Sequence, residues 1–153
     1  MRQQDLPFQG VYRLSPDGSE LQLLVDDFDQ PNGLCFAPEE RKLYVNDTVR
    51  KHIRRFDILA DGSLANGEVL AEVTGDGEGS PDGMKTDMAG NIYCTGPGGI
   101  HIFTDDGTSL GVALIPERVA NFTFGGNDMR DVFVTATSSL YRFRVKVPGP
   151  TLF

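Results

Sequence analysis

A short phrase occurs twice in this chain, and its recurrence restricts the fold more than any other feature. Gln-Pro-Asn-Gly-Leu occupies residues 30–34, and Ser-Pro-Asp-Gly-Met occupies residues 80–84. The two prolines lie 50 residues apart (81 − 31). Each phrase consists of Pro, an Asx residue, Gly and then the first apolar residue of an expected β-strand. A repeat of this period predicts equivalent units that stack on one another.

Strand and turn signals alternate along the whole chain, and no stretch shows a sustained helical period. Hairpin strands are expected at residues 10–14 and 21–25, 52–59 and 69–73, 99–103 and 111–115, with a further copy beginning in 139–145. Their turns contain Asp-Gly, as in Ser15-Pro16-Asp17-Gly18. Between the hairpins, a second recurring unit pairs residues 33–36 with 42–45, 83–86 with 91–94, and 122–124 with 131–134.

These units predict an all-β fold of roughly 13 antiparallel strands. The successive repeats supply two strands, then four, four and three, which amounts to about three blades of a β-propeller. We therefore expect residues 1–153 to form a single partial β-propeller domain. A β-sandwich or jelly roll is the alternative fold, but it does not require internal self-similarity.

Charge and cysteine content restrict the partners and the compartment. A net charge of −8 argues against binding to nucleic acid, and the basic residues at 50–51 and 54–55 are expected to form a solvated strand edge. No apolar run is long enough to span a membrane, and no secretion signal is visible. Cys35 and Cys94 lie in apolar runs, which indicates buried free thiols and a reducing, cytoplasmic setting.

The Asx residues of the two phrases are the candidate site. Asn32 offers an amide oxygen and Asp82 a carboxylate, and hard divalent cations bind such oxygens. Equivalent positions in two repeats could direct both oxygens at one ion. The alternative is that both residues only form turns, which Asx-Gly pairs favour. Asn46 and Asp47 follow an inner strand and are further candidates for the central pore. His52 and His101 lie on outer hairpins and are expected to be exposed or to pack, without a catalytic role.

Taken together, these motifs resemble the SMP-30, gluconolactonase and regucalcin family of lactonases. The resemblance is carried by residues 7–18, by Arg-Lys-Leu-Tyr-Val-Asn-Asp at 41–47, by the two Pro-Asx-Gly phrases, and by Phe-Gly-Gly at 124–126. It extends over about residues 7–145 and corresponds to the C-terminal half of the family. What it implies is therefore half of a six-bladed β-propeller.

The family resemblance also implies a chemistry. Asn32 falls on a metal-binding Asn of the family, and Asp82 falls on an Asp that is both a metal ligand and the proposed general base. The family's further metal ligand is a Glu in its N-terminal half, and no residue of this chain corresponds to it. The implied reaction is metal-dependent hydrolysis of a sugar lactone to its acid. Calcium is the first candidate for the metal, with zinc, magnesium and manganese as alternatives.

Half a propeller leaves two functional hypotheses open. The first is a lactonase whose missing blades come from a complementary chain or from a second copy in a homodimer. The second is a catalytically inactive truncated propeller or a binding module.

Overall fold

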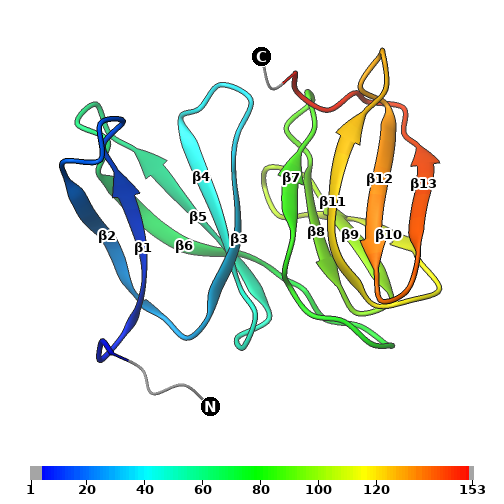
Figure 1. Ribbon diagram of the computed structural model, residues 1–153, viewed down its shortest axis with the longest axis horizontal. Helices are drawn as coiled ribbons and strands as arrows, with labels where there is room; N and C mark the ends of the chain where they lie inside the picture. The colour runs from blue at the N-terminus through cyan, green and yellow to red at the C-terminus, as the bar shows by residue number, and fades with distance from the viewer. Residues whose placement is uncertain (1–4, 152–153) are drawn as a thin grey trace.

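The computed structural model describes residues 5–151, which form 13 β-strands in four antiparallel sheets and contain no helix (Figure 1). Accordingly, no helix in this part of the chain could cross a membrane. The first sheet pairs β1 (Gln9–Leu14) with β2 (Leu21–Phe28). The other sheets are β3 (Pro31–Phe36), β4 (Lys42–Asp47), β5 (His52–Ile58) and β6 (Leu64–Glu72); β7 (Met84–Thr86), β8 (Ile92–Gly96), β9 (Gly99–Phe103) and β10 (Ser109–Leu114); and β11 (Val119–Gly125), β12 (Asp131–Ala136) and β13 (Leu140–Arg144).

Each sheet is a blade, and neighbouring blades meet through their first strands. Strand β3 contacts β7, and β7 in turn contacts β11. Every sheet is formed by strands that follow one another in the chain. This arrangement is a partial β-propeller with blades of two, four, four and three strands, as the repeats predict. The strands β3, β7 and β11 are the inner strands of their blades.

Three apolar cores lie between successive blades. The first contains Val11, Phe28, Leu43, Val45 and Phe56 and joins the β1–β2 sheet to the β3–β6 sheet. Two larger cores join the remaining blades, one around Tyr44, Ile53, Met84 and Ile92, and one around Tyr93, Ile100, Phe122, Phe124 and Val132. Burial of these side chains stabilises the stack, because a single blade cannot remove either of its faces from water.

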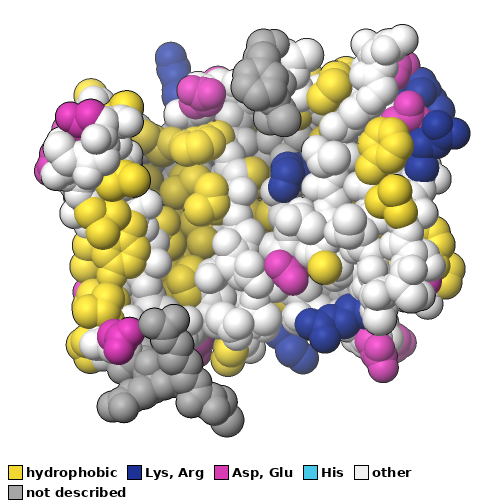
Figure 2. Space-filling model, in the orientation of Figure 1, with side chains coloured by type: hydrophobic (Ala, Val, Ile, Leu, Met, Phe, Trp, Pro, Cys, Tyr) yellow, Lys and Arg dark blue, Asp and Glu magenta, His cyan; other side chains and the backbone are white. Residues whose placement is uncertain are grey.

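One blade face is only partly covered. Leu34 pairs with Val45 and Phe36 pairs with Leu43, so Leu34 and Phe36 share a sheet face with the first core. Val45 and Leu43 are buried, whereas Leu34 and Phe36 remain 48% and 49% exposed. Figure 2 shows this apolar surface in the hollow beside β3 and, further out, over β1 and β2, whose exposed side chains are Tyr12, Leu14, Leu21 and Leu23.

Two local expectations need correction. Strand β6 begins at Leu64, not at Val69, because a register shift accommodates Asn66, whose φ is 53°, inside the strand. The basic residues are not simply solvated. Arg54 is 13% exposed, its guanidinium lies 4.8 Å from the ring centroids of Phe28 and Phe56, and it forms an ion pair with Asp27. These contacts fix the side chain of Arg54 against the first core.

Candidate metal centre

The two Pro-Asx-Gly segments lie at the same end of two neighbouring inner strands. Asn32 is the second residue of β3, and Asp82 lies two residues before β7. The pairing of β3 with β4 shifts between Pro31–Asp47 and Leu34–Val45, so one extra residue is inserted around Asn32. Such a bulge redirects side chains away from the regular pleat, and bulges are common beside active sites.

In each of the two blades, a side chain of the second strand accepts a hydrogen bond from the backbone of the Pro-Asx-Gly segment. In the β3–β6 blade, the backbone N–H of Gly33 donates to Asn46 Oδ1 (3.0 Å). In the next blade, the backbone N–H of Asp82 donates to Thr95 Oγ1 (2.9 Å). Asn46 and Thr95 are both fully buried. Both segments are therefore held by buried polar side chains in addition to the regular ladder.

Hydrogen bonds through Asn46 and Thr48 also connect the two segments. Asn46 Nδ2 donates to the backbone oxygen of Asp82 (2.9 Å), and Thr48 Oγ1 donates to that of Pro81 (2.7 Å). Asn32 Nδ2 in turn donates to Thr48 Oγ1 (3.2 Å). The positions of Asn32 and Asp82 are thus coupled across the boundary between two blades.

Each phrase requires a glycine because the adjacent blade approaches its backbone closely. The conformation of a turn is not the reason for the glycine. Neither Gly33 nor Gly83 has a positive φ. A Cβ on Gly33 would lie 2.0 Å from the backbone oxygen of Asp82, and one on Gly83 would lie 2.3 Å from Asn121 Oδ1. The Asx-Gly pairs therefore mark places where adjacent blades touch through their backbones.

The side-chain oxygens of the pair remain free for a ligand. Asn32 is exposed and uses only its Nδ2, and Asp82 is partly buried. Within residues 5–151, neither Asn32 Oδ1 nor the Asp82 carboxylate accepts a hydrogen bond from the protein. One amide oxygen and one carboxylate suit a hard cation such as calcium, which takes six to eight oxygens. They fit as two members of such a set, and the described residues contain no group of three or more His, Cys, Asp or Glu that could hold a metal.

Asp47 shows what a purely structural carboxylate looks like in this fold. It is fully buried and accepts hydrogen bonds from the backbone N–H groups of four residues: Asp29, Gln30, Val49 and Arg50. Burial raises the pKa of Asp47, but the four N–H donors outweigh burial and hold the pKa below its usual value. Asn46 and Asp47 therefore organise the loops around the site, and neither faces the pore.

The third repeat has no oxygen-bearing side chain at the position equivalent to Asn32 and Asp82. Phe122 pairs with Val134 as Leu34 pairs with Val45, which places Ala120 at the position of Asn32. The methyl group of Ala120 cannot bind a cation, although its backbone oxygen accepts a hydrogen bond from Gly83 N (3.0 Å). Asn46, Thr48 and Thr95 are the site residues that repeat spacing alone did not identify. The sequence feature that points to these three residues is a polar residue at or just after the end of an otherwise apolar second strand.

The cysteines and histidines support the fold. Cys35 and Cys94 are free, and burial raises the pKa of both thiols to about 12, so they stay protonated and unreactive. His101 is buried, stacks on Phe103, and its Nε2 lies 2.9 Å from the backbone oxygen of Pro97. His52 is also buried, and burial lowers its pKa. Both histidines pack within their blades.

Comparison with known proteins places this chain in a family. The model of the SMP-30/Gluconolactonase/LRE-like region matches residues 1–138, and the chain belongs to this family. A gluconolactonase from Zymomonas mobilis is 35% identical over 95% of the chain and 43% of its own length. Regucalcin from Danio rerio is 31% identical over 86% of the chain and 46% of its own length. The chain thus spans less than half the length of these relatives.

Solved structures agree with the fold. A gluconolactonase from Xanthomonas campestris superimposes with a TM-score of 0.83 at 34% identity, covering 96% of this chain and 47% of the other. A calcium-binding regucalcin from Agrobacterium tumefaciens gives a TM-score of 0.79 at 23% identity, covering 92% of this chain and 54% of the other. The partial propeller therefore corresponds to about half of each of these solved chains.

Proposed function

We propose that this chain contributes two metal ligands and the general base to the metal-dependent hydrolysis of a sugar lactone. The observation that carries the proposal is the pair of free oxygens, on Asn32 and Asp82, which a hydrogen-bond network holds at the same end of two adjacent inner strands. Family membership and relatives named gluconolactonase and pentonolactonase support a sugar lactone as the substrate class.

The two Asx residues have separate roles in this proposal. Asn32 would bind through Oδ1, because its Nδ2 is already committed to Thr48. A divalent cation, with calcium as our first choice, would polarise the lactone carbonyl as a Lewis acid. Asp82 would orient the attacking water and accept its proton, and its carboxylate is free of competing donors among the described residues. Opening of the ring then gives the hydroxy acid.

The remaining ligands would come from additional blades, whether these belong to the same polypeptide, to a complementary chain or to a second copy in a homodimer. The exposed Leu14 and Leu21 of the two-stranded β1–β2 sheet support such a contact, because blade faces of this kind are covered in a closed propeller. Light scattering tests the homodimer, and a monomer at all concentrations would exclude it.

A catalytically inactive propeller fragment, or a binding module, is the alternative function. It is favoured because residues 5–151 contain no group of three or more His, Cys, Asp or Glu side chains that could hold a metal ion. This alternative predicts no hydrolysis of lactones under any condition in which the chain is folded.

Thermal unfolding with calcium or zinc tests the metal site. A cation at a hundredfold excess over Kd should stabilise the wild type by about 2.7 kcal/mol. Asp82→Ala should abolish the stabilisation, and Asp17→Ala is the matched control because Asp17 lies in an identical Ser-Pro-Asp-Gly sequence. No stabilisation of the wild type, or an equal one in Asp82→Ala, would contradict the metal site. Acid release from glucono-1,5-lactone, measured in a pH-stat, tests the reaction separately.

We also propose that residues 1–153 behave as one domain and that the chain resides in the cytoplasm. The continuous series of inter-blade cores supports the first statement, and the two free cysteines support the second. A single cooperative urea transition and fractionation of cells expressing a tagged chain test the two statements.

A further inference from the structure

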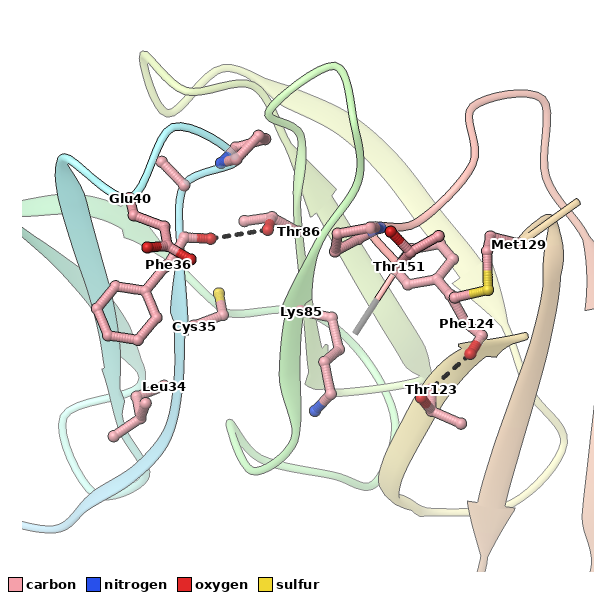
Figure 3. A pocket seen from close by; sticks show the side chains of 13 residues that line it. Leu34, Cys35, Phe36, Glu40, Lys85, Thr86, Thr123, Phe124, Met129 and Thr151 are labelled. Carbon is pink, nitrogen blue, oxygen red and sulfur yellow. Dashed lines mark hydrogen bonds between the residues drawn. The ribbon is translucent and has the colours of Figure 1, made fainter. Parts of the chain in front are cut away.

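A pocket of about 360 Å³ lies between the three inner strands, and neither Asn32 nor Asp82 lines it (Figure 3). Strand β3 provides Leu34, Cys35 and Phe36, β7 provides Lys85 and Thr86, and β11 provides Thr123 and Phe124. Ala37, Pro38, Met129, Pro150 and Thr151 complete its wall. Apart from Lys85 and the exposed Glu40 at its rim, the side chains that line it are apolar, neutral hydroxyls or a thiol.

Lys85 carries a positive charge for which the described part of the fold provides no ion-pair partner. It is partly buried, and Figure 3 shows its side chain extending from β7 into the space between β3 and β11. Its ammonium donates to the backbone oxygen of Met84 (3.1 Å) and lies 5.7 Å from the centroid of the Phe122 ring. No carboxylate among residues 5–151 lies within ion-pair distance of it. At least two of its three N–H donors are therefore available to a ligand.

The other polar groups of the wall are already committed. Thr86 Oγ1 donates to the backbone oxygen of Phe36 (2.8 Å), and Thr123 Oγ1 donates to that of Phe124 (3.3 Å). Burial raises the pKa of Cys35 to about 12, so its thiol is neutral. A polyhydroxylated ligand would leave most of its hydroxyls without partners against these walls, which is unfavourable. The pocket suits an apolar body that carries one negative charge.

The wall contributed by the segment 148–151 is fixed in place. Met88 N donates to the backbone oxygen of Pro148 (2.8 Å), and Gly149 N donates to that of Met129 (2.8 Å). Gly149 packs so closely on Phe124 that a Cβ would lie 2.2 Å from its ring. These contacts anchor residues 148 and 149, which lead directly into the lining residues Pro150 and Thr151. A wall anchored in this way reduces the reorganisation that binding requires.

We propose that this pocket binds an apolar monocarboxylate, such as a medium-chain fatty acid, whose carboxylate pairs with the ammonium of Lys85. The aliphatic body lies against Leu34, Phe36 and Phe124. This binding is independent of the metal pair and of lactone hydrolysis, because it uses neither Asn32 nor Asp82.

Calorimetric titration of the full chain, without added metal, tests the proposal. Octanoate should bind saturably, whereas octanol and octylammonium should bind at least about tenfold more weakly, since a charge-assisted bond contributes roughly 1.5–3 kcal/mol. From butanoate to octanoate, affinity should rise about threefold to fourfold per methylene group.

Variants identify the group responsible. Lys85→Met keeps the length of the side chain and removes the charge, so octanoate should bind at least about tenfold more weakly. Lys146→Met, which changes an exposed lysine outside the pocket, should leave binding unchanged. Thermal melting verifies that both variants fold, and amide shifts of β7 and β11 in the wild type locate the ligand. Equal affinity for octanoate and octanol, an unaltered affinity in folded Lys85→Met, shifts confined to other strands, or no saturable binding would each overturn the proposal.

Discussion

The same four residues, Ser-Pro-Asp-Gly, occur at 15–18 and at 80–83, and they adopt different structures. In the first copy, Gly18 has a φ of 73° and its N–H donates to Ser15 O (2.9 Å), which closes a turn between β1 and β2. In the second copy, Gly83 has no positive φ, and its N–H donates to Ala120 O (3.0 Å) on the next blade. The N–H of Gly18 is therefore hydrogen-bonded within its own turn, whereas the N–H of Gly83 is hydrogen-bonded to a neighbouring blade.

The two aspartates differ in the same way. Asp17 Oδ1 accepts hydrogen bonds from Ser15 Oγ (2.8 Å) and from the N–H and Oγ of Ser19 (3.1 and 2.8 Å). The carboxylate of Asp82 accepts none from the described protein groups, whereas its backbone N–H and oxygen are both bonded, to Thr95 and Asn46. The fold therefore fixes the backbone of Asp82 and leaves its carboxylate to a ligand. This difference distinguishes a turn former from a site residue.

The largest expected difference between the segments concerns their glycines. Gly83→Ala should lower the free energy of unfolding by about 3 kcal/mol, because the new Cβ would meet Asn121 at its Oδ1 and at its Cα. Gly18→Ala should cost only about 1 kcal/mol, because the position has a positive φ but open space around it. Urea unfolding of both variants measures the difference, and equal losses would contradict the assignment of Gly83 to a blade contact.

A smaller difference is expected from the polar groups that support each segment. Asn46→Ala should lower the free energy of unfolding by about 2 kcal/mol, because it leaves the Gly33 N–H and the Asp82 oxygen without a buried partner. Ser15→Ala removes bonds that are exposed to water and should cost about 0.5 kcal/mol. Denaturant titration compares the two, and Asn46→Ala should also weaken the response to calcium. A fully stable Asn46→Ala variant would mean that the network does not hold the site.

The smallest effect is a dependence of stability on pH that arises from Asp17 in the first segment. Hydrogen bonds from Ser15 and then Ser19 lower the pKa of Asp17 from 3.8 to about 2. Because the folded pKa lies below the unfolded one, the ionised carboxylate stabilises the fold above the unfolded pKa, and this contribution is lost as pH falls from about 3.8 to about 2.

Asp17→Asn isolates this contribution. The stability difference between the wild type and Asp17→Asn should be constant near neutral pH and should shrink as pH falls between the two pKa values of Asp17. Urea unfolding at several pH values, together with an NMR titration of the Asp17 carboxyl, measures both quantities. A difference that did not change with pH would show that Asp17 has the same pKa in the folded and unfolded chain.

The strand order was predictable because it depends on local patterns. Turn sequences such as 15–18 and alternating apolar runs gave the blades of two, four, four and three strands. The boundary at Leu64 was missed, because Asn66-Gly67 has the sequence of a turn but lies within a strand that shifts register. A local pattern cannot tell whether such a pair ends a strand or is accommodated within it, because the adjacent strand decides.

The sequence predicted the two candidate ligands but not the side chains that hold them in place. Asn32 and Asp82 followed from the repeat and from the family resemblance, and they remain predictions as metal ligands. The roles of Asn46, Thr48 and Thr95 depend on contacts between residues 13 to 36 positions apart in the chain. The contacts from Asn46 to Asp82 and from Thr48 to Pro81 arise only when two blades are placed side by side, and the sequence of a single segment does not contain that information.

Each sheet of this molecule consists of strands that are consecutive in the chain, as in the order β3-β4-β5-β6. Closing such short connections costs little chain entropy, which favours rapid pairing. During synthesis on the ribosome, one blade can therefore pair its strands before the next has emerged. The hydrogen bond from Thr86 to the backbone of Phe36 then forms as soon as the following inner strand appears. Translation can thus build the propeller blade by blade, with each finished sheet serving as the template for its successor.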